Sequence, residues 1–149
     1  MPSLGDVHRK FGEASEAAQL LETELGNILL FAGVVDQGLI ENPDADTAAA
    51  LFHKINRQTL RQLLKELTNS TESVDQSADH MAALLFRAFK ARNRLVHSFY
   101  RQHSFRENSE DGRAKMLEDL TNIHSDLLAA YKAIMRLSGV DLDKVISFA

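Results

Sequence analysis

Residues 11–35, FGEASEAAQLLETELGNILLFAGVV, decide the fold class, because their apolar side chains recur at alternating steps of three and four. The recurring residues are Phe11, Ala14, Ala18, Leu21, Leu25, Ile28, Ala32 and Val35. This spacing places them on one face and predicts a long amphipathic helix. The helix should end near Gly38, ahead of the turn residues 42–44. Gly26 and Gly33 lie inside it and each costs about 1 kcal/mol relative to alanine, so we expect another helix to pack closely there.

A second helix follows this turn in the sequence. It should begin after Asp46 or Thr47, because either side chain can cap it. Its buried side is marked by Leu51, Ile55, Leu63 and Leu67. The polar residues 68–73 offer local hydrogen bonds that compete with a helix, and they therefore predict a loop.

Two longer helices complete the expected pattern. The third begins around residues 77–79 and is broken by the polar residues 102–112. The fourth runs over about residues 113–137, with Gly139 as its C-terminal cap. Residues 141–148 can form a short closing helix. The fold class is therefore all-α, as a four- to five-helix bundle that is mostly antiparallel and up-down.

Composition supports one domain over residues 1–149, since single domains usually run to about 100–200 residues. The chain has no cysteine, which excludes disulfides, a thiolate zinc site and a cysteine nucleophile. The longest uncharged apolar run lies between Glu24 and Asp36 and is shorter than the roughly 20 residues that span a bilayer. The first residues do not resemble a signal peptide. We therefore expect a cytoplasmic protein without membrane contact.

Charge is distributed unevenly along the chain. The formal net charge is −4, yet no acidic residue occurs between Asp79 and Glu107. Six positive residues lie in this gap, so the remainder of the chain carries −10; they are Arg87, Lys90, Arg92, Arg94, Arg101 and Arg106. A segregated basic stretch is typical of a phosphate-binding surface. The alternative is a solvated helix face whose charges pair with acidic residues of other helices.

The basic stretch contains Lys90-Ala91-Arg92-Asn93-Arg94-Leu95-Val96-His97, in which four residues separate Arg92 from His97. This pattern, late in the third predicted helix of a small helical chain, resembles the motif of the HEPN superfamily. The resemblance implies a metal-independent endoribonuclease, often a toxin paired with an antitoxin protein or a component of defence. It also implies a homodimer in which motifs from two subunits meet at one cleft. Other members of that superfamily are non-catalytic and bind nucleotide, RNA or a partner protein.

The chemistry of these residue types is consistent with metal-independent RNA cleavage. His97 is the candidate acid/base, because histidine exchanges protons near neutral pH. Arg92 is the candidate clamp for phosphoryl oxygens that gain charge. Asn93 is assigned to orient His97 or to bind the phosphate. On a regular α-helix Arg92 and His97 would lie roughly 140° apart. Three arrangements can join them: long side chains, a distorted helix, or a second subunit across a two-fold axis.

Neighbouring residues extend the candidate substrate-binding surface. Lys90 and Arg94 lie four residues apart and share a face. Tyr100 can stack on a base, and Arg101 can hold a neighbouring phosphate, with His103 beside them. A buried aromatic ring and a solvated charge are the structural alternatives for Tyr100 and Arg101.

No other motif of the chain indicates a cofactor or a metal. The sequence has no Glu-x-x-His pair, no His-Glu-x-x-His, no glycine-rich phosphate loop and no Gly-x-Ser-x-Gly. His124 falls in the apolar stripe of the fourth helix, where a core or interface histidine is expected. Three hypotheses remain: a HEPN-type endoribonuclease, a non-catalytic HEPN-like module, and a helical oligomerisation or regulatory protein.

Overall fold

The computed structural model describes residues 1–58, 62 and 76–137, and all regular structure in this part is helical. This confirms the all-α prediction. The elements are α1 (Leu4–Asp36), α2 (Ala45–Asn56), α4 (Gln76–Asn93), a π-helical segment η1 (Arg94–Ser98), α5 (Phe99–His103), a 3-10 segment η2 (Ser104–Asn108) and α6 (Glu110–Leu137). The predicted loop 68–73, the buried positions Leu63 and Leu67, the cap Gly139 and the closing helix 141–148 lie outside the described residues.

Helix α1 begins with a capping box and ends where the sequence predicts. The Ser3 side chain accepts a hydrogen bond from the Asp6 backbone at 3.1 Å, and the Asp6 carboxylate accepts one from the Ser3 backbone at 2.8 Å. The helix ends at Asp36, just before Gly38, whose φ of +66° suits glycine. The apolar stripe is buried over Ala14, Ala18, Leu21 and Leu25, whereas Ala32 and Val35 are exposed.

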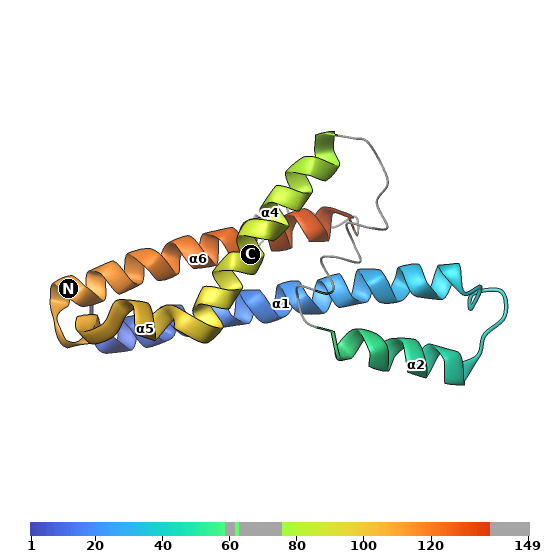
Figure 1. Ribbon diagram of the computed structural model, residues 1–149, viewed down its shortest axis with the longest axis horizontal. Coiled ribbons are helices and arrows are strands. Elements are labelled where there is room, and N and C mark those ends of the chain that lie inside the picture. The colour runs from blue at the N-terminus through green and yellow to red at the C-terminus, as the bar shows by residue number, and fades with distance from the viewer. Residues whose placement is uncertain (59–61, 63–75, 138–149) are drawn as a thin grey trace, which may run out of the picture.

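Helices α1 and α6 lie side by side and run in the same direction (Figure 1). The Arg113 Nε donates to the Pro2 carbonyl at 2.8 Å, and Lys10 Nζ lies 2.9 Å from His124 Nδ1 further along both helices. In an up-down four-helix bundle the first and last helices would instead be antiparallel. The mostly antiparallel order expected from the sequence is therefore wrong for this pair, which has the most extensive contacts of the fold.

The segment α4–η1–α5 runs antiparallel to α1 and α6 and completes the core (Figure 1). The rings of Phe11 and Phe99 are 5.8 Å apart, while Glu22 meets Arg92 nearer the other end of α1. The largest fully buried side chains come from these three elements: Phe99, Leu21, Leu25, Met116, Leu120, Leu127, Ile134 and Val7.

Helix α2 packs on the second half of α1, as the two glycines predict. A Cβ atom on Gly33 would lie 2.7 Å from Leu51 Cδ2, and one on Gly26 would lie 3.2 Å from Ile55 Cγ2. Helix α2 begins at Ala45, two to three residues earlier than expected. The reason is that Asp44, rather than the residues after it, caps the helix by accepting from the Asp46 backbone at 3.2 Å.

The predicted break over residues 102–112 is shorter than expected. Helix α5 continues through His103, Ser104 turns the chain with a φ of 51°, and α6 begins at Glu110 rather than Arg113. The Ser109 side chain accepts from the Gly112 backbone at 3.0 Å, so Ser109 caps α6. The break thus contains a 3-10 turn that packs on the first turns of α6.

By length and composition alone, α1 is able to cross a membrane. Its most apolar 18-residue window has a mean hydropathy of 1.3, and 28% of that window is buried in the protein. The expectation that no segment is long enough considered only the uncharged run between Glu24 and Asp36. The core helix of a soluble protein meets the same criteria, so this property does not place the protein in a membrane.

Candidate active site

The helix that carries the Arg92–His97 motif is distorted within the motif. Arg92 and Asn93 end α4, and His97 lies inside the π-helical segment η1. A π-helix joins residues i and i+5, whereas an α-helix joins residues i and i+4. The wider turn reduces the angular separation of residues five apart. The helix is therefore distorted at His97, while the hydrogen-bond partners of Arg92 among the described residues are Glu22 and Asn93 rather than His97.

Arg92 is held by two neighbours. Its Nε donates to Glu22 Oε1 of α1 at 2.9 Å, and its Nη1 donates to Asn93 Oδ1 at 3.3 Å. The Arg92 and Glu22 side chains remain 23% and 31% exposed, so the guanidinium still reaches solvent. Asn93 was assigned to orient His97 or to bind the phosphate, and in the structure it contacts Arg92. The sequence analysis did not identify Glu22, because its pairing depends on how α1 packs against α4.

His97 is exposed, as are Val96 beside it and Tyr100 one turn on. Within the described part of the chain, His97 has no hydrogen bond or ion pair. Its ring nitrogens are thus free to contact a ligand. We name Glu22, Arg92, Asn93 and His97 the Arg92 site; in it the first three residues are in contact, and His97 makes no hydrogen bond to them.

Tyr100 packs partly on the core. Its ring lies 5.4 Å from Phe11 and 5.3 Å from Phe99, while 41% of the residue is exposed. Partial burial, and then the charge of Glu107, raise the pKa of its phenol. The exposed part of the ring is available for stacking, but its inner face is part of the aromatic packing.

Lys90 and Arg101, the two other proposed phosphate contacts, lie on the exposed surface. The Lys90 ammonium lies 4.6 Å from the ring centroid of Phe86, itself 56% exposed. Arg101 has no polar partner among the described residues. The structure does not bring either side chain into contact with Arg92 or His97.

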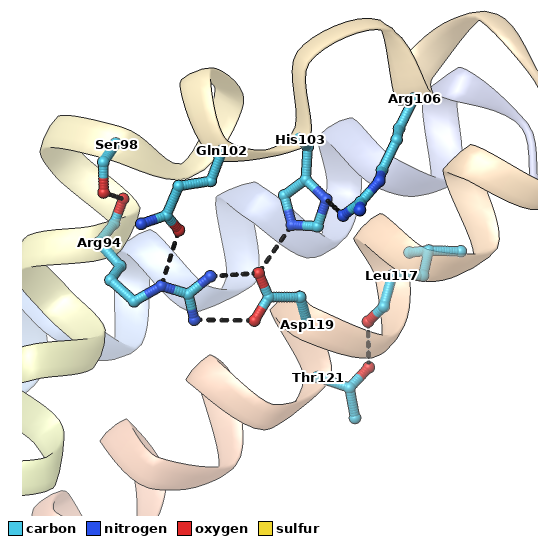
Figure 2. Close-up of polar contacts among 8 residues, drawn as sticks. All are labelled: Arg94, Ser98, Gln102, His103, Arg106, Leu117, Asp119 and Thr121. Carbon is cyan, nitrogen blue, oxygen red and sulfur yellow. Dashed lines mark hydrogen bonds and ion pairs between the residues drawn. The ribbon is translucent and has the colours of Figure 1, made fainter.

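Arg94 and His103 belong to a separate group of side chains, drawn in Figure 2. We name it the Asp119 cluster; it contains Arg94, Gln102, His103, Arg106 and Asp119. Arg94 donates through Nη1 and Nη2 to the two oxygens of Asp119, at 2.9 and 2.5 Å, and through Nε to Gln102 at 2.9 Å. Arg94 begins the π-helical segment, so Asp119 of α6 anchors that segment from outside.

His103 is buried within the Asp119 cluster and uses both ring nitrogens. Its Nε2 lies 2.7 Å from Asp119 Oδ2, and its Nδ1 lies 2.9 Å from Arg106 Nη1. Because arginine only donates, Nδ1 accepts, and the hydrogen on Nε2 is donated to Asp119. His103 was predicted to bind substrate, but only 5% of it is exposed. Its contacts give it a structural part in linking η2 to α6.

The sequence analysis did not identify Asp119 or Gln102 as partners. The available signal was the alternative interpretation of the basic stretch, namely that its charges pair with acidic residues of other helices. Arg92 pairs with Glu22 and Arg94 pairs with Asp119 in this way. The remaining positive residues of the stretch have no ion pair within the described residues.

The Asp119 carboxylate is stabilised in its charged form. Burial opposes ionisation, but the hydrogen bonds from Arg94 and His103 and the charge of Arg94 outweigh it, so the pKa of Asp119 lies below its usual range. Asp119→Asn keeps the shape of the side chain but places an amide NH₂ group against the hydrogen-bond donors of Arg94 and His103. We expect the free energy of unfolding to fall by about 2 kcal/mol, the value of a hydrogen-bonded charged group. Chemical denaturation of the wild type and the variant at neutral pH measures this change in the free energy of unfolding.

The same substitution should remove part of the acid sensitivity. A lowered folded-state pKa contributes stability above the unfolded value of about 3.9, and this contribution is lost as the pH falls through the folded value. Wild type should therefore lose its advantage over Asp119→Asn below about pH 4. Asp126→Asn on the same helix is the matched control. An equal loss in both variants would show that Asp119 contributes no more than any helix carboxylate.

Comparison of the chain with family models, with curated proteins and with solved structures finds no match in any of the three. Among the described residues, no group of three or more His, Asp or Glu side chains is arranged to hold a metal ion.

Proposed function

We propose that the protein is a HEPN-like, metal-independent endoribonuclease that cleaves RNA with Arg92 and His97. The observation that carries this proposal is the π-helical segment, which begins two residues after Arg92 and contains the exposed His97. Single π turns inside α-helices occur frequently at functional sites. The proposal includes a cytoplasmic homodimer with the cleft between two copies, and a toxin or defence role with a possible antitoxin partner.

The reaction follows from the groups at the Arg92 site. His97 removes the proton of the ribose 2′-hydroxyl, whose oxygen bonds to the adjacent phosphorus. The bond from phosphorus to the 5′-oxygen breaks, leaving a 2′,3′-cyclic phosphate and a 5′-hydroxyl. The leaving oxygen takes a proton, which a histidine of the second copy supplies. Arg92, oriented by Glu22 and Asn93, donates to the phosphoryl oxygens as their charge grows.

One observation favours the non-catalytic alternative. Glu22 lies 2.9 Å from Arg92 and offsets its charge, which weakens the attraction of this guanidinium for phosphate. A non-catalytic module would bind RNA, nucleotide or a protein and leave RNA intact. Binding of RNA by this module would weaken as the salt concentration rises.

The decisive experiment incubates the purified protein with a mixed RNA pool in excess chelator. The proposal expects fragments that carry 2′,3′-cyclic phosphate ends. Salt-dependent binding without fragments would support the module instead. Cleavage that requires a divalent metal would overturn the mechanism.

A further inference from the structure

A second group of basic side chains lines a pocket that the proposed function does not use. The pocket measures about 530 Å³ and lies between α1, α4 and α6. Every titratable side chain that lines it is a base: Lys10, His80, His124, Lys132 and Arg136. Its apolar lining residues include Leu84 and Leu128. Ligand pockets typically measure about 300–1,000 Å³, so its size suits a small organic molecule.

Lys10 and His124 form the best-defined polar contact of this pocket. Lys10 Nζ lies 2.9 Å from His124 Nδ1, and lysine can only donate, so the imidazole accepts and is neutral. Its Nε2–H is then a second donor. Burial, and next the charge of Lys10, lower the pKa of His124, although Glu13 and Glu16 act in the opposite direction. Glu13 also contacts Lys10 at 3.3 Å, from a side chain that is 49% exposed.

The charges that act on His124 are those of Lys10, Glu13 and Glu16. Together with the other bases that line the pocket, Lys10 favours a negatively charged ligand. The Lys10 contact satisfies Nδ1 of the half-buried His124 and leaves its Nε2–H for another partner. An anion in the pocket can accept from the Lys10 ammonium or from the His124 Nε2–H.

We propose that this pocket binds a phosphate monoester that carries an apolar organic group. The phosphate lies against Lys10 and His124, where ammonium and imidazole donors meet a doubly charged acceptor. The organic group covers Leu84 and Leu128. Lys132 lies two turns beyond His124 on α6, about 12 Å along the helix, and adds positive potential at the other end. This site is independent of the Arg92 site and of the proposed RNA cleavage.

Phenyl phosphate tests the proposal, with phenol and inorganic phosphate as comparisons at constant ionic strength. Calorimetry should show phenyl phosphate binding more tightly than either comparison. The imidazole proton signal of His124, followed by NMR against pH, should show its pKa rising when phenyl phosphate is present. This NMR measurement uses the wild-type protein and does not depend on any variant folding.

Variants locate the binding. Lys10→Gln and His124→Gln should each weaken phenyl phosphate about tenfold or more, the loss of one charge-assisted hydrogen bond. Lys54→Gln on α2, outside the pocket, should change it less than twofold. The proposal is overturned if phenyl phosphate fails to bind at 10 mM, about the weakest useful affinity. The proposal is also overturned if Lys54→Gln weakens binding as much as the two pocket variants. The same holds if phenol or inorganic phosphate binds as tightly as phenyl phosphate.

Discussion

His97→Ala is expected to lower the rate of RNA cleavage by about 10²–10⁴-fold, the usual contribution of a general acid or base. His97 is exposed and has no polar partner among the described residues, so its removal leaves no buried group unsatisfied. Helix content and the free energy of unfolding should therefore stay at wild-type values. Single-turnover cleavage of a defined RNA, together with circular dichroism, measures both quantities.

Arg92→Gln should lower the same rate by a comparable factor through loss of the phosphate clamp. It also removes the ion pair with Glu22, so a structural effect must be separated from a catalytic one. The variant Glu22→Gln distinguishes these two effects, because it breaks the same ion pair but leaves Arg92 in place. If Arg92 acts on the phosphate, Glu22→Gln keeps the guanidinium and retains most of the activity. If the pair serves only to hold α4 on α1, the two variants should behave alike.

Matched controls come from positions of the same residue type. His8→Ala on α1 and Arg87→Gln on α4 replace exposed residues outside the Arg92 site. Both should cleave RNA at the wild-type rate. Unchanged cleavage in His97→Ala, or an equal loss in His8→Ala, would exclude His97 as the acid/base.

The parts of the fold that the sequence predicted depend on local physical chemistry. The spacing of Ala14, Ala18, Leu21 and Leu25 predicted α1, and Gly26 and Gly33 predicted its close contact with α2. The parallel arrangement of α1 and α6 was not predictable in this way. The relative direction of these two helices depends on where the segments between them turn. The spacing of apolar residues on a helix does not determine whether the helix packed against it is parallel or antiparallel.

In the Arg92 site, too, some features follow from the local sequence and others depend on tertiary packing. The residue types and spacing of Arg92, Asn93 and His97 selected the motif, and the angle between Arg92 and His97 left a distorted helix as one of three open arrangements. The π-helical segment begins at Arg94, whose guanidinium makes paired hydrogen bonds to Asp119 of α6. Sequence reasoning took the charge of Arg94 as available for substrate. Asp119, 25 residues later, accepts from that side chain instead.

Gly112→Ala should destabilise the protein strongly, although alanine is the better helix former. A Cβ on Gly112 would lie 2.0 Å from the Arg106 carbonyl oxygen and 2.6 Å from the Arg106 Cα. These are backbone atoms, so the 3-10 turn η2 must move away from α6. Overpacking of this kind costs about 3 kcal/mol, which exceeds the roughly 1 kcal/mol gained from alanine propensity. The displacement also pulls Arg106 away from His103.

Gly12→Ala is the control that separates packing from propensity. Gly12 lies on the exposed side of α1, and no atom lies within 4 Å of the position that its Cβ would occupy. This substitution should raise the free energy of unfolding by about 0.5–1 kcal/mol. The midpoints of chemical denaturation of the two variants should therefore shift in opposite directions from the wild-type midpoint. If Gly112→Ala is as stable as Gly12→Ala, then η2 does not pack on α6 as closely as the structure shows, and the link from Arg106 through His103 to Asp119 would not hold the turn.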